Sequence, residues 1–208
     1  MKRNFISYGF NMKIITISGA SGSGKSSLAK LLQKALPESL LLSIDRYYLS
    51  KLEQLKLNGF CNFDYPHSLD VDLMHEHLSL LKSKGQAKVP VYDFTISERA
   101  GYENVFAKDH IIVDGLFAGD ILSELSDLNI FMDVDLDLAL IRRIERDMKE
   151  RGRTLESVTN QYINEVRPAY FKHIAHIKNK ADLVFSNNDD PDMLKEHAED
   201  VLKILKTK

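Results

Sequence analysis

Residues 13–36 read KIITISGASGSGKSSLAKLLQKAL, and this stretch decides the fold. Residues 13–18 are rich in β-branched side chains, which predicts a short buried strand. Residues 25–36 carry apolar side chains at helical spacing and stop before Pro37, which predicts a helix. Between the two lies a glycine-rich loop. The stretch therefore predicts a strand, a loop and a helix in direct succession.

The loop at residues 19–26 matches the pattern G-x-x-x-x-G-K-[ST] at every fixed position, in the strand-to-helix context that gives the pattern its meaning. Glycines let backbone N–H groups close around phosphate oxygens, and the helix N-terminus adds the positive end of its dipole. Lys25 would neutralise β- and γ-oxygens, and Ser26 would offer a hydroxyl to Mg²⁺. We therefore expect a nucleoside triphosphate, ATP or alternatively GTP, with Mg²⁺. The residues expected around the phosphates are Gly19, Ala20, Ser21, Gly22, Ser23, Gly24, Lys25, Ser26 and Ser27.

The rest of the chain alternates apolar runs with amphipathic stretches. Strands are expected at 40–44, 88–94 (as a strand or hairpin arm), 110–113, 129–134 and 181–185. Helices are expected at 71–84, 136–151, 154–178 with a break near Pro168, and 191–205. This alternation predicts an α/β fold with a doubly wound, mainly parallel sheet flanked by helices. At 208 residues without a linker, the chain is expected to form one domain over residues 12–208 after a disordered lead at 1–11.

Composition narrows the classes of partner and the compartment that the protein is expected to have. A formal net charge of -2 and a pI near 6.4 argue against a broad basic surface for a nucleic-acid polymer. No apolar run has the length of a signal peptide core or a membrane span. Cys61 is the single cysteine, which excludes an intramolecular disulfide and suits a reducing compartment. We therefore expect a cytoplasmic protein with a small-molecule substrate and no membrane partner.

Two aspartates follow predicted strands directly. Asp45 comes after residues 40–44 and Asp114 after residues 111–113. An aspartate after a strand is more often a turn residue or a helix cap. Open α/β sheets, however, bind ligands at the carboxyl ends of their strands, where a phosphate loop is already predicted. We therefore expect Asp45 and Asp114 to converge with Ser26 on one Mg²⁺ site.

Basic residues gather between positions 142 and 153. This segment holds six basic and three acidic residues in a chain whose net charge is negative. Gly152 can end the preceding helix and leave arginines on a mobile tip. The pattern fits a lid whose arginines pair with phosphate oxygens and exclude water. It fits equally a solvated helix with ion pairs four residues apart.

Several separated motifs together resemble the uridine kinase (uridine-cytidine kinase) family of phosphoribulokinase-like P-loop kinases. They are GASGSGKSS at 19–27, DRYY at 45–48, NFDYP at 62–66, PVYDF at 90–94, VDG at 113–115, RD at 146–147, ERGR at 150–153 and QY at 161–162. The resemblance implies a P-loop NTPase fold with a substrate-binding insertion at about 46–105 and a helical lid at about 142–165. It also implies a homotetramer and ATP-dependent phosphorylation of the 5′-hydroxyl of a pyrimidine ribonucleoside, uridine or cytidine.

The resemblance also implies residue roles. Asp45 resembles the catalytic carboxylate that acts with Lys25, and Asp114 resembles an acidic magnesium partner that is commonly glutamate in the family. Asp64 resembles the carboxylate that holds ribose hydroxyls, although by itself it reads as a turn residue before a proline. The arginines that resemble phosphate ligands are Arg146, Arg151 and Arg153. The residues that resemble acceptor contacts are Tyr48, Phe63, Tyr92, Phe94, Ser97, Arg143 and Gln161.

Two features keep other functions open. Ser97 stands where the family usually has a histidine that reads the pyrimidine, so another nucleoside, a sugar phosphate or a vitamin-like alcohol is an alternative acceptor. Tyr92 and Phe94, two residues apart on a predicted strand, face the same side and suit either a nucleobase or ordinary core packing. A nucleotide-sensing module without transfer activity is a second alternative.

Overall fold

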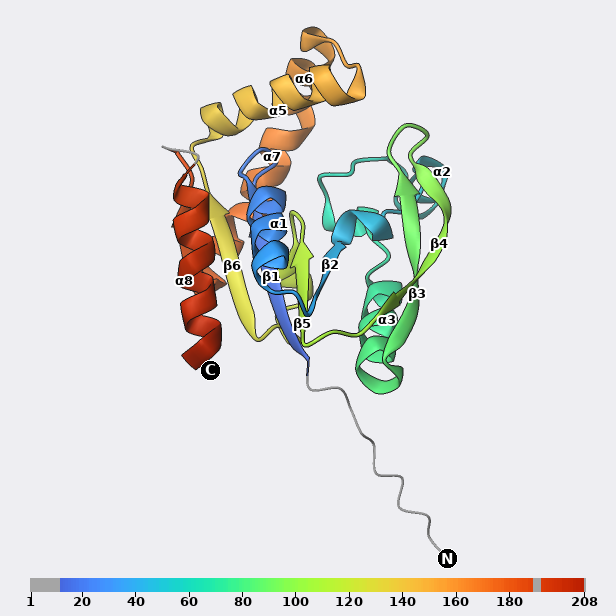
Figure 1. Ribbon diagram of the computed structural model, residues 1–208. Helices are drawn as coiled ribbons and strands as arrows, with labels where there is room; N and C mark the ends of the chain where they lie inside the picture. Colours follow the sequence, from blue (N-terminus) through green and yellow to red (C-terminus); the bar gives the residue numbers. More distant parts are fainter. Residues whose placement is uncertain (1–11, 189–191, 208) are drawn as a thin grey trace, which may run out of the picture.

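The computed structural model describes residues 12–188 and 192–207. The expected lead at 1–11 and the first residue of the expected last helix, Pro191, lie outside the described residues. Five strands form one sheet in the order β2-β5-β1-β6-β7, and every pairing is parallel (Figure 1). The strands are β1 (Lys13–Gly19), β2 (Ser39–Ser43), β5 (His110–Asp114), β6 (Leu128–Asp133) and β7 (Leu183–Ser186). This confirms the α/β class and the parallel sheet.

Both faces of the sheet are covered. The helices α1 (Lys25–Ala35) and α8 (Met193–Thr207) pack together on one face. The buried side chains of that layer include Ile15, Ile17, Leu28, Leu32, Ile130 and Val201. The short helix α4 (Ala118–Ile121) and the 3-10 segment η5 (Ala175–Lys180) lie on the other face, where the core includes Ile14, Ile111, Val113, Phe117, Phe131 and Ile177. Alternate residues of the central strands thus point into two cores, as expected for a doubly wound sheet.

A second group of elements lies beside β2 (Figure 1). Its strands β3 (Gln86–Asp93) and β4 (Glu98–Phe106) form an antiparallel hairpin that is separate from the parallel sheet. The expected strand at 88–94 is therefore a hairpin arm. The connecting segments are η1 (Ile44–Tyr47), α2 (Lys51–Asn58), η2 (Pro66–Ser68) and α3 (Val71–Lys84). Ion pairs Arg46–Glu103, at 2.6 Å, and Arg99–Asp70, at 2.9 Å, tie the hairpin to η1 and to the start of α3.

Helix α2 was not expected, and its structure explains why. Three of its leucines, Leu52, Leu55 and Leu57, are exposed, so the helix carries no apolar stripe that matches a buried face. Its ends are set locally instead. Ser50 and Glu53 form a reciprocal capping box, and Gly59 ends the helix in the left-handed region with φ +76°.

The helix α5 (Leu136–Arg151) projects from the top of the sheet and ends at Gly152, whose φ is +61° (Figure 1). It is followed by α6 (Leu155–Gln161). The expected long helix at 154–178 is divided into α6, a π-helical turn η3 (Tyr162–Val166), α7 (Arg167–Ala169), a second π-helical turn η4 (Tyr170–Ile174) and η5. Pro168 removes a backbone donor and crowds the preceding turn, and the wider π turns lie on either side of it. No helix in the described ranges is long and apolar enough to cross a membrane.

Replacing Phe131 by alanine is expected to destabilise the fold. The side chain is 1% exposed in the core on the sheet face that α4 and η5 cover, so its loss leaves a cavity. We expect unfolding to become easier by about 3–5 kcal/mol, which lowers Tm by roughly 6–20 °C. Phe106→Ala makes the same change on β4 where the ring is 60% exposed, and its Tm should stay near that of the parent. Thermal unfolding followed by circular dichroism measures both, and equal shifts would contradict the assignment of Phe131 to the core.

Candidate active site

The loop at residues 19–24 wraps the N-terminus of α1. Neighbouring atoms leave no room for a side chain at two of its glycines. Gly22 has φ +88° and Gly24 has φ +93°, which is the left-handed region that favours glycine. A Cβ at Gly22 would lie 2.3 Å from the carbonyl oxygen of Ala139 on α5. A Cβ at Gly24 would lie 2.4 Å from the side-chain amide of Asn187. The glycines therefore also permit the loop to pack tightly against α5 and the end of β7.

Asn187 directly follows β7, and its side chain hydrogen-bonds the phosphate loop. Its Nδ2 donates to the carbonyl oxygen of Ser23 at 2.9 Å, and its backbone N–H donates to Asp133 at 2.9 Å. The residue is only 5% exposed. No sequence motif pointed to Asn187. Its place two residues after the last expected strand, at the same sheet edge as Asp45 and Asp114, was the signal that could have found it.

Lys25 lies buried at the centre of this edge. Its Nζ donates to the carbonyl oxygen of Ala20 at 2.7 Å, and the residue is 8% exposed. Burial lowers the pKa of Lys25 to about 8, while the negative charges of Asp114 and Asp45 oppose that shift. An ammonium has three donors, so Lys25 can bind phosphate oxygens and keep its bond to Ala20. A desolvated cation in a glycine-rich loop fits a polyphosphate.

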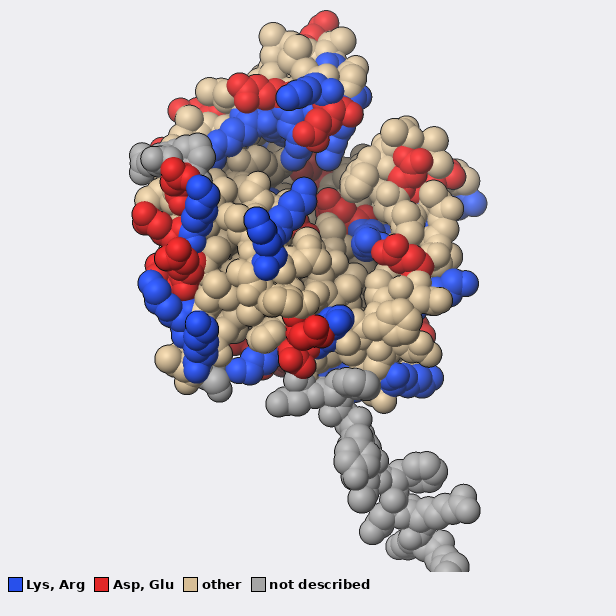
Figure 2. All heavy atoms as spheres, in the orientation of Figure 1, with Lys and Arg blue, Asp and Glu red and all other residues tan. Residues whose placement is uncertain are grey.

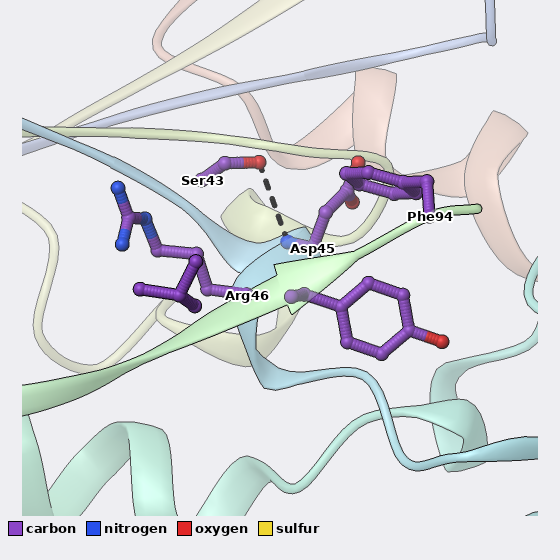
Figure 3. Close-up of a pocket in the computed structure, with 6 residues that line it drawn as sticks. Ser43, Asp45, Arg46 and Phe94 are labelled. Carbon is purple, nitrogen blue, oxygen red and sulfur yellow. Dashed lines mark hydrogen bonds between the residues drawn. The ribbon is translucent and has the colours of Figure 1, made fainter. Parts of the chain in front are cut away.

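Asp114 and Asp45 both lie close enough to Lys25 for their negative charges to raise its pKa. The hydroxyl of Ser26 donates to Oδ2 of Asp114 at 2.5 Å. Asp45 lies on η1, where its backbone N–H donates to Oγ of Ser43 at 3.3 Å (Figure 3). Burial and the neighbouring carboxylate of Asp114 raise the pKa of Asp45 to about 6, and Lys25 opposes the rise. The carboxylates of Asp114, which is buried, and Asp45, which is half-buried, are therefore close enough to repel each other.

These donors fit Mg²⁺. A divalent cation would offset the repulsion between Asp45 and Asp114, and hydroxyl and carboxylate oxygens are the ligands that Mg²⁺ prefers. Within residues 12–188 and 192–207, no group of three His, Cys, Asp or Glu side chains could hold a metal by itself. Phosphate oxygens and water would have to complete the coordination, as is usual for Mg²⁺ at a nucleotide site.

A pocket opens beside Asp45. It is lined by Ser43, Asp45, Arg46, Val91, Tyr92 and Phe94. Asp45 and Phe94 lie on the same side of this pocket, and the Arg46 guanidinium points away from them (Figure 3). The rings of Tyr48, Phe63, Tyr92 and Phe94 form a chain of edge contacts, with centroids 5.1 Å apart for Tyr48–Phe63, 5.6 Å for Tyr48–Tyr92 and 5.3 Å for Tyr92–Phe94. The four aromatic residues named from the sequence therefore lie together.

Ser97 lies at the turn of the hairpin next to this aromatic group. It is the one non-glycine residue with positive φ, at +57°, among the described residues. Its side chain is close enough to the hydroxyl of Tyr92 to affect the pKa of that group, which burial raises. Ser97 thus lies near the Tyr92 hydroxyl but is not one of the six residues that line the pocket beside Asp45.

Asp64 faces Arg143 on α5. Its carboxylate is buried and lies 3.6 Å from NH1 of Arg143. Burial raises the pKa of Asp64, and the positive charge of Arg143 opposes the rise. Arg143 also donates to Oε1 of Gln161 at 3.1 Å, and Arg153 donates to the same oxygen at 2.5 Å. Asp64, Arg143 and Gln161 therefore form one connected polar group.

The arm formed by α5 and α6 reaches over this edge. NH2 of Arg146 donates to Oγ of Ser21 at 3.4 Å, so the arm touches the phosphate loop. The guanidinium of Arg151 lies 5.5 Å from the ring centroid of Phe94, so the arm also touches the hairpin. Figure 2 shows the hollow between the arm and the hairpin side, with blue basic atoms on its upper wall and red acidic atoms deeper inside. Ser27 is exposed on α1, and its backbone N–H donates to Gly24 at 3.1 Å.

A parallel α/β sheet with this phosphate loop, two aspartates at the carboxyl edge and an arginine-bearing arm defines a P-loop kinase. Residues 14–193 match the model of the phosphoribulokinase / uridine kinase family. The chain belongs to this family and is a uridine kinase-like P-loop kinase.

Individual relatives agree with this assignment. The chain is 40% identical over 176 residues to a uridine kinase of Borrelia garinii, covering 83% of this chain and 85% of the relative. It is 40% identical over 184 residues to a uridine kinase of Staphylococcus haemolyticus, covering 84% and 87%. A solved phosphoribulokinase from Rhodobacter spheroides has a similar fold, with a TM-score of 0.62 at 18% identity over 85% of this chain and 70% of that one.

Replacing Gly22 by alanine is expected to abolish nucleotide binding. The new Cβ would meet backbone at 2.3 Å and strain a φ of +88°, so the loop must move away from the geometry that points its N–H groups inward. We expect the affinity for Mg·ATP to fall by about 100-fold or more. Gly101→Ala is the matched control, since nothing lies within 4 Å of its Cβ and its φ is not positive. Calorimetric titration with Mg·ATP measures both, and normal binding by Gly22→Ala would refute the packing argument.

Proposed function

We propose that this kinase transfers the γ-phosphoryl group of ATP to the 5′-hydroxyl of a pyrimidine ribonucleoside, producing UMP from uridine or CMP from cytidine. The observation that carries the proposal is the position of Asp45. Its carboxylate is electrostatically coupled to Lys25 and Asp114 on one side and lines the aromatic pocket on the other. A carboxylate at the boundary between a phosphate site and an acceptor pocket is suited to act on the hydroxyl that attacks the phosphate.

The transfer follows from this arrangement. Asp45 orients the 5′-hydroxyl and accepts its proton as the hydroxyl oxygen bonds to the γ-phosphorus. The bond from that phosphorus to the β,γ-bridging oxygen breaks, and ADP leaves. The pKa of about 6 for Asp45 leaves it mainly ionised at neutral pH yet more basic than an ordinary aspartate. Lys25 neutralises charge on the phosphate oxygens during the step.

Mg²⁺ would be held by Ser26 and Asp114, with Asp45 nearby, and would supply charge neutralisation at the phosphates. The backbone of residues 19–27 would surround the phosphates. Arg146, Arg151 and Arg153 would approach them from the arm, where their guanidinium groups can bond phosphate oxygens in pairs. Closure of the arm would exclude water that could otherwise hydrolyse ATP.

The acceptor would lie between the hairpin and α5. Asp64, with two acceptor oxygens, suits the paired ribose hydroxyls, and Arg143 and Gln161 lie beside it. The rings of Tyr48, Phe63, Tyr92 and Phe94 suit contact with a nucleobase. The names of the relatives, uridine kinase at 40% identity, favour a pyrimidine nucleoside. The homotetramer implied by the resemblance belongs to the same proposal, and light scattering on the purified protein measures it.

A different acceptor is the second candidate, and Ser97 is the observation that favours it. A serine is shorter than the histidine that the family pattern places there, so its hydroxyl reaches less far toward a base than an imidazole nitrogen would. The base edge would therefore be recognised more weakly, which leaves room for another nucleoside or another small alcohol.

An acceptor panel tests the proposal directly. ADP release with Mg·ATP would be followed against uridine, cytidine, their deoxy forms, purine nucleosides, nicotinamide riboside, ribulose 5-phosphate and pantothenate. Turnover with uridine or cytidine above all others supports the proposal. Turnover with another acceptor supports the second candidate, and ATP binding without turnover on any acceptor favours a nucleotide-sensing role.

Asp45→Asn is expected to lower kcat by about 100- to 10,000-fold with the best acceptor, because the amide cannot accept the hydroxyl proton. Calorimetric titration should show that ATP still binds. Asp72→Asn removes the same charge from an exposed position at the start of α3 and should leave kcat unchanged. Near-normal turnover by Asp45→Asn would remove Asp45 from the catalytic step.

Ser97→His is expected to change the acceptor ranking. The imidazole adds a donor and an acceptor beside Tyr92, so kcat/KM for uridine and cytidine should rise relative to the other acceptors by about 10-fold. Thr95→His places the same ring at an exposed position of the hairpin turn and serves as the control. An unchanged ranking in Ser97→His would show that this position does not set specificity.

A further inference from the structure

Asp147 of α5 is fully buried, at 0% exposure, inside a group of four arginines. Its carboxylate is 2.8 Å from Arg146, 3.4 Å from Arg151, 3.6 Å from Arg143 and 3.8 Å from Arg153. Arg143 and Arg146 precede Asp147 on α5, Arg151 is the last residue of the helix, and Arg153 follows Gly152. The carboxylate of Asp147 therefore contacts arginines that precede it and arginines that follow it in the sequence.

The backbone of Asp147 also shapes this tip. Its carbonyl oxygen accepts the N–H of Gly152, where α5 ends, and the N–H of Arg153 at 3.1 Å. The chain reverses after α5, which brings Arg153 back beside the carboxylate of Asp147. Four guanidinium groups so close together repel one another, and the buried negative charge offsets that repulsion.

One contact in the group is incomplete. Nε of Arg143 and Oδ2 of Asp147 face each other at 3.6 Å, and both atoms are buried without a hydrogen-bond partner in the described part of the chain. Leaving two buried polar atoms unpaired is unfavourable. A small movement of the Arg143 side chain would complete the bond.

We propose that Asp147 is a positioning residue, which aims Arg146, Arg151 and Arg153 at the nucleotide phosphates and Arg143 at the acceptor. The proposal rests on the proposed function for the direction in which these arginines act. Asp147 does not itself touch substrate, because the guanidinium groups cover it. Each guanidinium has five donors, so an arginine can bond Asp147 and still bond a phosphate oxygen.

The same group joins the two substrate sites. Arg143 lies 3.6 Å from Asp64 on the acceptor side, and Arg146 donates to Ser21 in the phosphate loop at 3.4 Å. Both arginines contact Asp147. Neutralising Asp147 therefore disturbs the nucleotide and acceptor sites together, whereas losing one arginine disturbs mainly one.

Binding of Mg·ATP tests the proposal without any acceptor. Asp147→Asn keeps the size of the side chain and removes its charge, and we expect its Kd for Mg·ATP to rise by about 10- to 100-fold. Asp147→Glu keeps the charge but moves it by one methylene, so its Kd should lie between those of Asp147→Asn and the parent. Glu150→Gln removes a charge from an exposed position on the same helix and should bind ATP within about 2-fold of the parent. Calorimetric titration of the whole protein measures all four.

Steady-state kinetics separates positioning from a merely structural role. A loss of folded protein lowers the apparent kcat but leaves KM for ATP unchanged, because KM does not depend on the amount of active enzyme. We expect KM for ATP and for the acceptor to rise in Asp147→Asn, measured below its unfolding temperature. Parent-like or tighter ATP binding by the folded Asp147 variants would overturn the proposal. Failure of the pyrimidine acceptors with ATP binding intact would instead refute only the proposed acceptor.

Discussion

The rest of the site depends on one constraint, which is that the buried ammonium of Lys25 must be compensated. Lys25 lies in a glycine-rich loop at the carboxyl edge of a parallel sheet, where Asp114 and Asp45 supply negative charge. The parallel register places these residues together, because β1 pairs directly with β5, and β5 pairs with β2. The charges of Asp45 and Asp114 offset the unfavourable burial of the Lys25 ammonium, and at the same time they repel each other. Such an arrangement favours the arrival of polyphosphate and a divalent cation together.

Around this edge, the protein places two structures that do not belong to the sheet. The β3–β4 hairpin brings aromatic rings to one side of Asp45, and α5 brings arginines to the other. They meet where Arg151 stacks against Phe94. The hairpin shares one apolar core with the sheet, in which Val89 and Val105 are buried together with Ile111, and α5 reaches the phosphate loop where Arg146 donates to Ser21.

Much of this could be predicted from local sequence. The glycine loop, β1 and α1 depend on neighbouring residues, and the motif and apolar period described them correctly. Helix α2 was missed because its leucines are exposed and its ends depend on Ser50, Glu53 and Gly59. The helix expected at 154–178 was divided by π-helical turns on both sides of Pro168, a detail that apolar period does not record. Asn187 was missed because its contact with Ser23 joins residues 164 positions apart.

The sequence by itself determined the phosphate loop, because a few adjacent residues there permit one local conformation, and it determined the parallel α/β class and the kinase family, because these rest on the alternation of apolar and amphipathic stretches and on the order of short motifs. Only the tertiary structure decided that the expected strand at 88–94 is an arm of a separate hairpin, and that Tyr48, Phe63, Tyr92 and Phe94 lie together. It also decided that Asp147 lies buried among four arginines instead of on a solvated helix face. The physical reason is that charge pairing and aromatic packing depend on distances between segments, which the order of residues along the chain does not contain.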